Sequence, residues 1–412
     1  MNPEIKQRIE RIRCGEQPEG YKKTKVGVIP DVWRCYQIHK CLSIYNHERK
    51  PISEDVRKTI PGPYPYYGPT QAQGYISTYE SEGPAVLIGE DGDHFLKYKD
   101  REMTMYVDGK YTVNNHAHVL RGTELCETKW FYYTYQHKSL FDAITRQGAG
   151  RYKLTKEALI KLPLQCPPIE EQRKIISILN TQDKVIELKE KRLAEKQRQK
   201  KYLMQQLLTG KKRLPGFRGE WKKVKVGSFI KEIDERSTVN NQYEILSVTK
   251  NGMVSQSSHF NKQIASENNV GYKVVRRGNL AFSTMNLWMG SLGILRICDI
   301  GIVSPAYKVF EFNKNLIVIN FAENYMRSAE MIWIYKANSE QGASIVRRNL
   351  DIQALLNSEV ALPNISEQTA IAEVLSTADH EIDLLRQDIE QEKQKKKALM
   401  QLLLTGIVRV KV

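Results

Sequence analysis

The sequence contains few cysteines, and none of them occurs in a C-x-x-C pair. There are six in 412 residues, and they lie far apart: Cys14, Cys35, Cys41, Cys126, Cys166 and Cys298. Disulfide frameworks and zinc sites usually show closely spaced cysteines. We therefore predict reduced thiols, no metal site, and a cytoplasmic location.

Long apolar stretches are also missing. No run approaches the 18 consecutive apolar residues that a membrane-spanning helix needs. The first residues, MNPEIKQRIERIRCGE, contain no apolar segment of the kind found in a secretory signal. The sequence therefore predicts neither a membrane span nor a signal peptide.

Acidic residues are outnumbered by basic ones. The chain has 63 Lys and Arg against 47 Asp and Glu, a net charge of +16. Hydrophobic residues make up 41%, which is enough to build real cores. The length predicts two or three domains, and the charge favours a polyanionic partner, either nucleic acid or an anionic membrane surface.

Known catalytic motifs are absent from the sequence. A base-modifying amino-methyltransferase needs Asn/Asp-Pro-Pro-aromatic, but the only Pro-Pro pair is flanked by Cys166 and Ile169. Neither Gly109-Lys110 nor Gly210-Lys211 has the spacing or the hydroxyl of a phosphate-binding loop. His116 and His118 have no acid or cysteine at ligand spacing, so we interpret them as structural. We predict that the chain has no active site of its own.

The strongest positive feature is an internal repeat. Residues 169–210 align without a gap with residues 365–406, and both segments end in Leu-Leu-Thr-Gly. Proline precedes each segment and glycine ends it, as is typical of helix boundaries. About 38 residues at a rise of 1.5 Å would span roughly 57 Å, which indicates a coiled coil.

The heptad pattern predicts that the two long helices pair with each other. Apolar residues occur at most core positions, and both helices become polar at the same two positions, 196/392 and 200/396. Helices this highly charged do not stand alone in water. We expect an antiparallel pair with pseudo-two-fold symmetry; a parallel homodimer is the alternative.

The blocks between the repeats have a different character. Short apolar runs are bounded by turn signals such as Asp91-Gly92 and Asn251-Gly252, which indicates strands and tight turns. We predict an α+β fold with two globular domains joined by two long antiparallel coiled-coil helices. The predicted segments are an N-terminal helix and linker (1–32), a first domain (33–165), a central helix (166–213), a second domain (214–362) and a C-terminal helix (363–412).

Together, these features resemble the specificity subunit of type I restriction–modification systems. The resemblance covers essentially the whole chain. It rests on the order of blocks and helices, on Glu171-Gln172 and Glu367-Gln368 near the helix starts, and on the closing Leu-Leu-Thr-Gly motif. Strings such as Val86–Gly92 and Val113–Leu120 in the first block add to it.

The resemblance implies a prokaryotic, cytoplasmic, non-catalytic subunit. Each target-recognition domain would read one half of a bipartite, asymmetric site in double-stranded DNA. The helices would set the spacer and dock two methyltransferase subunits, which carry S-adenosylmethionine; this chain would bind no cofactor. Motor-nuclease subunits would join that complex.

We select candidate site residues by chemistry. Base readers and phosphate anchors are polar, basic or aromatic side chains in loops. The DNA-binding candidates are Tyr66, Tyr67, Gln71, Gln73, Lys97, Lys99, Arg101, Asn114, Asn115, Arg146, Gln147, Arg151, Thr249, Lys250, Asn251, Asn286, Trp288, Arg347 and Arg348. The partner-binding candidates are Glu171, Gln172, Leu207, Leu208, Glu367, Gln368, Leu403 and Leu404.

Two other functions remain open at this point. One is the recognition subunit of a related restriction–methylation enzyme outside type I. The other is a coiled-coil scaffold that binds DNA without sequence specificity. A scaffold would be expected to carry similar domains in both copies, whereas these two blocks have diverged.

Overall fold

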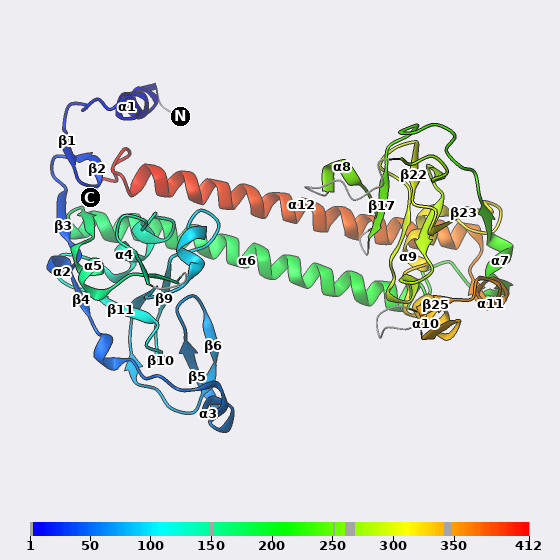
Figure 1. The fold of residues 1–412 in the computed structure, drawn as a ribbon, viewed down its shortest axis with the longest axis horizontal. Coiled ribbons are helices and arrows are strands. Elements are labelled where there is room, and N and C mark those ends of the chain that lie inside the picture. The colour runs from blue at the N-terminus through cyan, green and yellow to red at the C-terminus, as the bar shows by residue number, and fades with distance from the viewer. Residues whose placement is uncertain (1–2, 148–150, 250–251, 260–267, 342–347, 412) are drawn as a thin grey trace. The chain divides into compact units, whose positions relative to one another are not determined.

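A computed structural model describes residues 3–147, 151–249, 252–259, 268–341 and 348–411. The chain forms two compact units (Figure 1). The first contains residues 1–189 and 388–412, and the second contains residues 190–387. Within the described residues, no helix has the length and apolar character needed to cross a membrane.

Two helices of 39 residues each occupy the repeated segments: α6 (Ile169–Leu207) and α12 (Ile365–Leu403). Both end in the same way. The Lys212 amide donates to the Gln206 carbonyl at 3.1 Å, and the equivalent Val408 amide donates to Leu402 at 3.0 Å. The sequence repeat is therefore also a repeat of helix length and helix termination.

The two long helices pair in opposite directions, as the heptads predict. In the first unit, Asp183 of α6 pairs with Lys396 of α12 at 2.7 Å. In the second unit, Lys196 pairs with Glu381 at 2.6 Å and Lys200 with Asp379 at 2.5 Å. Residue numbers thus rise along one helix while they fall along the other, so the antiparallel prediction is confirmed.

The polar positions of the heptads hold charges that face partners on the other helix. Gln182 donates to Glu392 at 2.6 Å, and Lys189 contacts Glu392 at 2.9 Å and Asp388 at 2.8 Å. Apolar side chains are buried along the rest of the helix contact: Ile175, Leu179, Ile186, Ile371, Leu375, Ile382 and Ile389. A charged layer between apolar layers favours one register over others.

Each unit contains one α+β domain. The first unit contains α1 (Pro3–Arg13), β1 (Tyr21–Thr24), β2 (Gly27–Pro30), β3 (Arg34–Gln37), α2 (Ile38–Cys41), β4 (Leu42–Ile44), α3 (Glu54–Thr59), β5 (Pro61–Tyr67), β6 (Ala72–Ile76), β7 (Ser81–Glu82), β8 (Ala85–Gly89), β9 (Thr104–Val107), β10 (Lys110–Val113), β11 (Ala117–Gly122), α4 (Thr128–Tyr135), β12 (Thr145–Gln147), β13 (Arg151–Lys153), α5 (Lys156–Lys161) and β14 (Pro163–Cys166). Its two larger sheets have the strand orders β4-β11-β8-β9 and β6-β5-β10-β7.

The second unit contains β15 (Lys222–Lys225), α7 (Val226–Phe229), β16 (Ile230–Ile233), β17 (Leu246–Thr249), β18 (Gly252–Ser255), α8 (Gln256–His259), β19 (Lys273–Arg276), β20 (Leu280–Ser283), β21 (Leu292–Ile294), β22 (Ile300–Val303), β23 (Tyr307–Phe312), α9 (Ile319–Tyr325), α10 (Ala329–Ala337), β24 (Ser339–Gln341), β25 (Arg348–Leu350), α11 (Ile352–Asn357) and β26 (Glu359–Leu362). Its largest described sheet has the order β16-β23-β20-β21.

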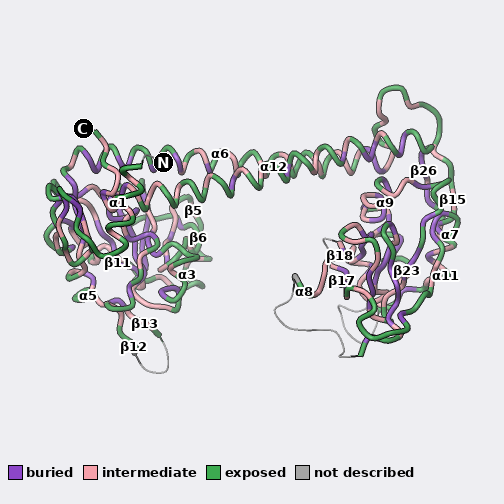
Figure 2. Tube along the Cα trace, turned by 90° about the horizontal axis from the view of Figure 1, so that it is seen from above, coloured by how far each residue is buried: buried purple, intermediate pink, exposed green. Residues whose placement is uncertain are grey.

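Both domains close in the same way. In the first, the entering strand β3 pairs antiparallel with β14, the strand that leads into α6. In the second, β15 pairs antiparallel with β26, which leads into α12. Each core includes the start of one long helix and the end of the other: Ile175 and Leu403 pack in the first core, and Ile371 and Leu207 pack in the second (Figure 2).

A buried carboxylate lies at the start of each long helix. In the first unit, Arg409 donates to Glu171 at 2.5 and 2.8 Å, and the Trp33 indole donates to it at 3.0 Å. In the second unit, Arg213 donates to Glu367 at 2.5 Å through two nitrogens. We call these groups the first and second junctions. Each ties the segment that follows one long helix to the start of the other.

The adjacent glutamines complete the junctions. Gln172 accepts from the Glu127 amide and donates to the Leu125 and Pro167 carbonyls, each at 2.9 Å. Gln368 accepts from the Val318 amide at 2.8 Å and donates to the Leu316 and Pro363 carbonyls at 2.9 Å. The same three bonds therefore hold a different domain to each helix.

The glycine of Leu-Leu-Thr-Gly is required at both junctions. Gly210 and Gly406 have φ angles of 67° and 72°, which side chains rarely adopt. A Cβ atom at Gly406 would lie 2.5 Å from Pro30, and one at Gly210 would lie 3.3 Å from Trp221. The helix end can pack against the aromatic residue because this position has no side chain.

The charged layer predicts a pH-dependent contribution to stability. Hydrogen bonds from Gln182 and then Lys189 lower the pKa of Glu392 from its ordinary 4.5 to about 2. A carboxyl group with a lowered pKa stabilises the fold above its ordinary pKa, and the contribution is lost as the pH falls through the folded value. The difference in thermal midpoint between the wild type and Glu392→Gln should therefore shrink as the pH falls from about 5 to about 2.

Glu390→Gln, on the exposed surface of the same helix, is the matched control and should show no such trend. A Glu392→Gln difference that stayed constant with pH would contradict the assignment.

The first junction predicts a specific pattern of stability. Arg409→Ala leaves the fully buried Glu171 carboxylate without its main counter-charge, which should cost about 3–5 kcal/mol of unfolding free energy. Adding Glu171→Gln removes the uncompensated charge and should recover part of that loss. Denaturant unfolding of both variants checks this; a double variant no more stable than Arg409→Ala would refute it.

Candidate nucleic-acid interface

In the first domain, several turns meet at the ends of the strands. Asn114 lies in the turn between β10 and β11, and its side-chain amide donates to the side-chain oxygen of Gln73 in β6 at 3.3 Å. His116 of the same turn contacts the Asp91 carboxylate at 2.8 Å, and the Asp91 backbone forms an isolated antiparallel β-bridge with Lys153 of β13. Three turns that are distant in sequence therefore form one polar surface, which we call the turn surface.

Most of the candidate DNA-binding residues of this domain are exposed. They are Gln71, Gln73, Lys97, Lys99, Arg101, Asn115, Arg146 and Arg151. Gln73 and Asn115 belong to the turn surface, and Arg151 is the first residue of β13, the strand that ends at Lys153. Gln147 ends β12, and its side chain is outside the described part of the structure. Exposed amides can reach base edges and exposed guanidinium groups can reach phosphates.

Two candidates are not available for direct contact. Tyr66 is 1% exposed; its hydroxyl accepts from the Ile52 amide at 2.9 Å and donates to the Lys50 carbonyl at 3.0 Å. Asn114 is 5% exposed; its side chain donates to Gln73 and accepts from the His116 backbone amide. The prediction that these two side chains contact DNA is corrected: they position the turns. Tyr67 is half-buried, with its ring 6.1 Å from Tyr111.

An ion-pair network supports the turn surface, and sequence inspection missed it. Glu90 pairs with Arg49 at 2.6 Å and with Lys153 at 3.4 Å. Burial opposes ionisation of Glu90, but the Arg49 hydrogen bond and the nearby positive charges outweigh it and lower its pKa. These residues lie far apart in the sequence, so spacing gives no signal for them.

In the second domain, two turns meet around Trp288. The Arg348 guanidinium lies 5.6 Å from the Trp288 ring, and the Arg348 amide donates to the Met285 carbonyl at 3.3 Å. Asn286 and Trp288 are both half-buried here. The Thr249 hydroxyl donates to the Gly252 carbonyl across the β17–β18 turn at 3.0 Å. Three candidates, Lys250, Asn251 and Arg347, are outside the described residues.

Arg348 has a structural role that the sequence did not indicate. Its guanidinium donates to the Lys336 and Ser339 carbonyls, both at 3.3 Å, at the end of α10. A cation near a helix C-terminus complements the helix dipole. Arg348 thus anchors the β24–β25 hairpin, and it is a weaker candidate for a phosphate contact than the exposed Arg146 and Arg151.

The candidate partner-binding residues face the interior. Glu171, Gln172, Glu367 and Gln368 are each 0% exposed and form the junctions, and the leucine pairs of both Leu-Leu-Thr-Gly motifs are at most 7% exposed. Buried side chains cannot contact another chain directly, so their predicted role changes to holding the domains. The four leucines are Leu207, Leu208, Leu403 and Leu404.

Two exposed grooves beside the long helices are better placed to receive a partner. One, of about 440 Å³, lies in the first unit between α4 and α6 and is lined by Tyr106, Lys129, Ser177, Asn180 and Lys184. The other lies in the second unit, where Leu214, Pro215 and Phe217 flank α12 at Ala370 and Val374. The lining of the first mixes apolar side chains with charged ones, three basic residues and Glu127, whereas the second is largely apolar.

The chain is similar to several known proteins. Residues 30–197 match the family model described as the type I restriction modification DNA specificity domain. A putative type I restriction enzyme specificity subunit of Haemophilus influenzae is 34% identical over 138 residues, which is 34% of each chain. The type I restriction enzyme MjaVIII specificity subunit of Methanocaldococcus jannaschii is 23% identical over 425 residues, covering 95% of this chain and 97% of the relative.

Solved structures share the fold. The S subunit of a type I restriction-modification system from M. genitalium has a TM-score of 0.54 at 12% identity, covering 90% of this chain and 96% of that one. A structure described in work on complex assembly and conformational transition of the type I R-M system has a TM-score of 0.53 at 14% identity, covering 92% and 99%. Over nearly its whole length the chain is thus similar to type I restriction enzyme specificity subunits, and residues 30–197 match the domain model of that family.

Proposed function

We propose that this chain supplies the DNA sequence specificity of a type I restriction–modification complex and that each domain reads one half of a bipartite, asymmetric site. Residues 33–165 form the first target-recognition domain of this proposal, and residues 214–362 form the second. The chain would act in the cytoplasm of a prokaryote.

The observation that carries the proposal is that the junctions repeat while the turns do not. Glu171 and Glu367 each pair with an arginine, and Gln172 and Gln368 make equivalent bonds. The first domain, however, presents exposed Gln71, Gln73 and Asn115, and the second presents the turn around Trp288. Two similar junctions that carry domains with different exposed surfaces suit one ligand whose two halves differ.

Charge and side-chain chemistry divide the binding task. The net charge of +16 favours a duplex, which carries one negative charge per about 1.7 Å. Phosphate contacts by exposed arginines and lysines would give salt-sensitive affinity without sequence preference. The amides of Gln71, Gln73 and Asn115 suit adenine or other base edges in the major groove.

The long helices would fix the gap between the half-sites and carry the partner subunits. Their charged layers oppose sliding of one helix along the other. Two methyltransferase subunits would bind S-adenosylmethionine and modify adenine, and motor-nuclease subunits would complete the complex. The grooves beside α6 and α12 are the proposed partner surfaces. This chain itself would contribute recognition without catalysis.

The decisive experiment maps adenine methylation. The chain is co-expressed with its cognate methyltransferase subunit, and methylated positions are mapped across the host genome. We expect two short, unlike motifs separated by a constant gap. Absent methylation, or a motif without a gap, would contradict the proposal; sequence-independent binding would favour a non-specific scaffold.

The same assay tests the turn surface. Gln73→Ala should relax the base preference at one position of one half-site, with a cost of about 1–3 kcal/mol, and leave the other half-site and the gap unchanged. The control is Gln17→Ala, because Gln17 is also an exposed glutamine. Gln136 is buried and would not serve as a control. Unchanged preference in Gln73→Ala would exclude this residue as a base reader.

Arg151 is predicted to be a phosphate anchor. Arg151→Ala should weaken binding to all DNA sequences alike and reduce the slope of log affinity against log salt by about 1. Fluorescence anisotropy of labelled duplexes over a range of salt concentrations measures this for the methyltransferase complex. Lys156→Ala, an exposed change on the neighbouring α5, is the control. A change in which bases are preferred would assign Arg151 to base recognition instead.

A further inference from the structure

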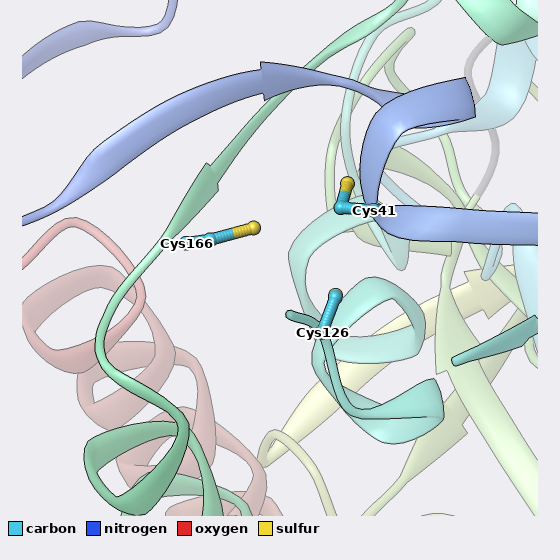
Figure 3. Close-up of side chains that lie close together, drawn as sticks. All are labelled: Cys41, Cys126 and Cys166. Carbon is cyan, nitrogen blue, oxygen red and sulfur yellow. The ribbon is translucent and has the colours of Figure 1, made fainter. Parts of the chain in front are cut away.

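Three cysteines that are far apart in the sequence meet in the core of the first unit. Cys41 ends α2, Cys126 lies in the turn between β11 and α4, and Cys166 ends β14 (Figure 3). Their sulfur atoms all lie within 4.8 Å of one another. The sequence predicted no metal site because it lacks C-x-x-C spacing. The fold instead brings the thiols together from three separate segments.

The cluster is enclosed by apolar side chains. Cys41 and Cys126 are 0% exposed and Cys166 is 3% exposed, and all three belong to the same core as Trp130 and Leu164. A buried thiol can act simply as a small apolar side chain. Three sulfur atoms within 4.8 Å of one another also form a candidate ligand set for a soft metal ion.

We propose that Cys41, Cys126 and Cys166 form a three-coordinate site for a monovalent thiophilic metal ion, Cu(I). The ion would bond to all three sulfur atoms, and each thiol would release its proton to solvent as its bond to the metal forms. No electron is transferred, so the ion remains Cu(I). Soft sulfur ligands select Cu(I).

The dimensions fit an ion of this kind. A sulfur triangle with sides of at most 4.8 Å has its centre no more than about 2.8 Å from each sulfur. A metal–sulfur bond of about 2.3 Å then requires inward shifts of at most about 0.5 Å. Zinc prefers four ligands, and among the described residues the converging group contains three cysteines with no histidine or carboxylate.

An occupied site would stabilise the first unit. It would link α2, the start of α4 and β14, the strand that leads into α6. A ligand that binds only the folded state stabilises it according to its concentration relative to its dissociation constant. This inference is independent of the proposed role in DNA recognition.

The test uses the reduced full-length protein without oxygen. Cu(I) is titrated against a chromophoric Cu(I) chelator, and X-ray absorption counts the sulfur ligands. We expect one tight Cu(I) per chain with three sulfurs at about 2.3 Å. Cys41→Ala, Cys126→Ala and Cys166→Ala should each weaken binding by more than about 100-fold. Cys14→Ala and Cys298→Ala, outside the cluster, should not.

Thermal unfolding without copper establishes that each variant folds. If one variant does not fold, the sulfur count of the copper-loaded wild type and the copper affinities of the two remaining variants decide the assignment. Tight copper binding that survives all three cluster substitutions, or that is lost with Cys14→Ala, would overturn the proposal. So would the absence of any binding in competition with the chelator.

Discussion

The architecture depends on one buried ion pair that occurs twice. Glu171 and Glu367 are fully buried at the starts of the long helices, and each is bound by an arginine that follows the end of the other helix. A carboxylate in this position is tolerated only with a closely fitted partner. Each domain is therefore tied both to the helix that leaves it and to the helix that arrives. The antiparallel order follows, because Arg213 and Arg409 must reach the starts of α12 and α6.

With these junctions fixed, the rest of each domain can vary. The glutamine beside each carboxylate holds two backbone carbonyls and one amide, so it places no demand on the side chains of the domain. The paired strands β3–β14 and β15–β26 close both domains at the same point. The turns at the far ends of the strands carry no such constraint. Equivalent junctions therefore coexist with different turns in the two domains.

The sequence predicts the helices well and the sites poorly, for physical reasons. A gapless repeat and a heptad pattern are local signals, so the boundaries near Ile169 and Leu403 and the antiparallel pairing could be inferred. Burial depends on contacts between distant residues. Tyr66 and Asn114 are polar residues in a loop-like sequence, yet the fold buries them. The three clustered cysteines and the Glu90 network were missed for the same reason, because their members come from separate segments.

The central claim is that two unlike domains are attached through similar junctions to the paired long helices, and that each domain recognises its DNA half-site independently. A chimera tests it most directly: residues 38–162, between the end of β3 and β14, are replaced by the equivalent block of a relative, and the methylated motif is mapped in the complex. The account predicts that one half-site changes while the other half-site and the gap stay the same. A change in both half-sites, or in the gap, would contradict it.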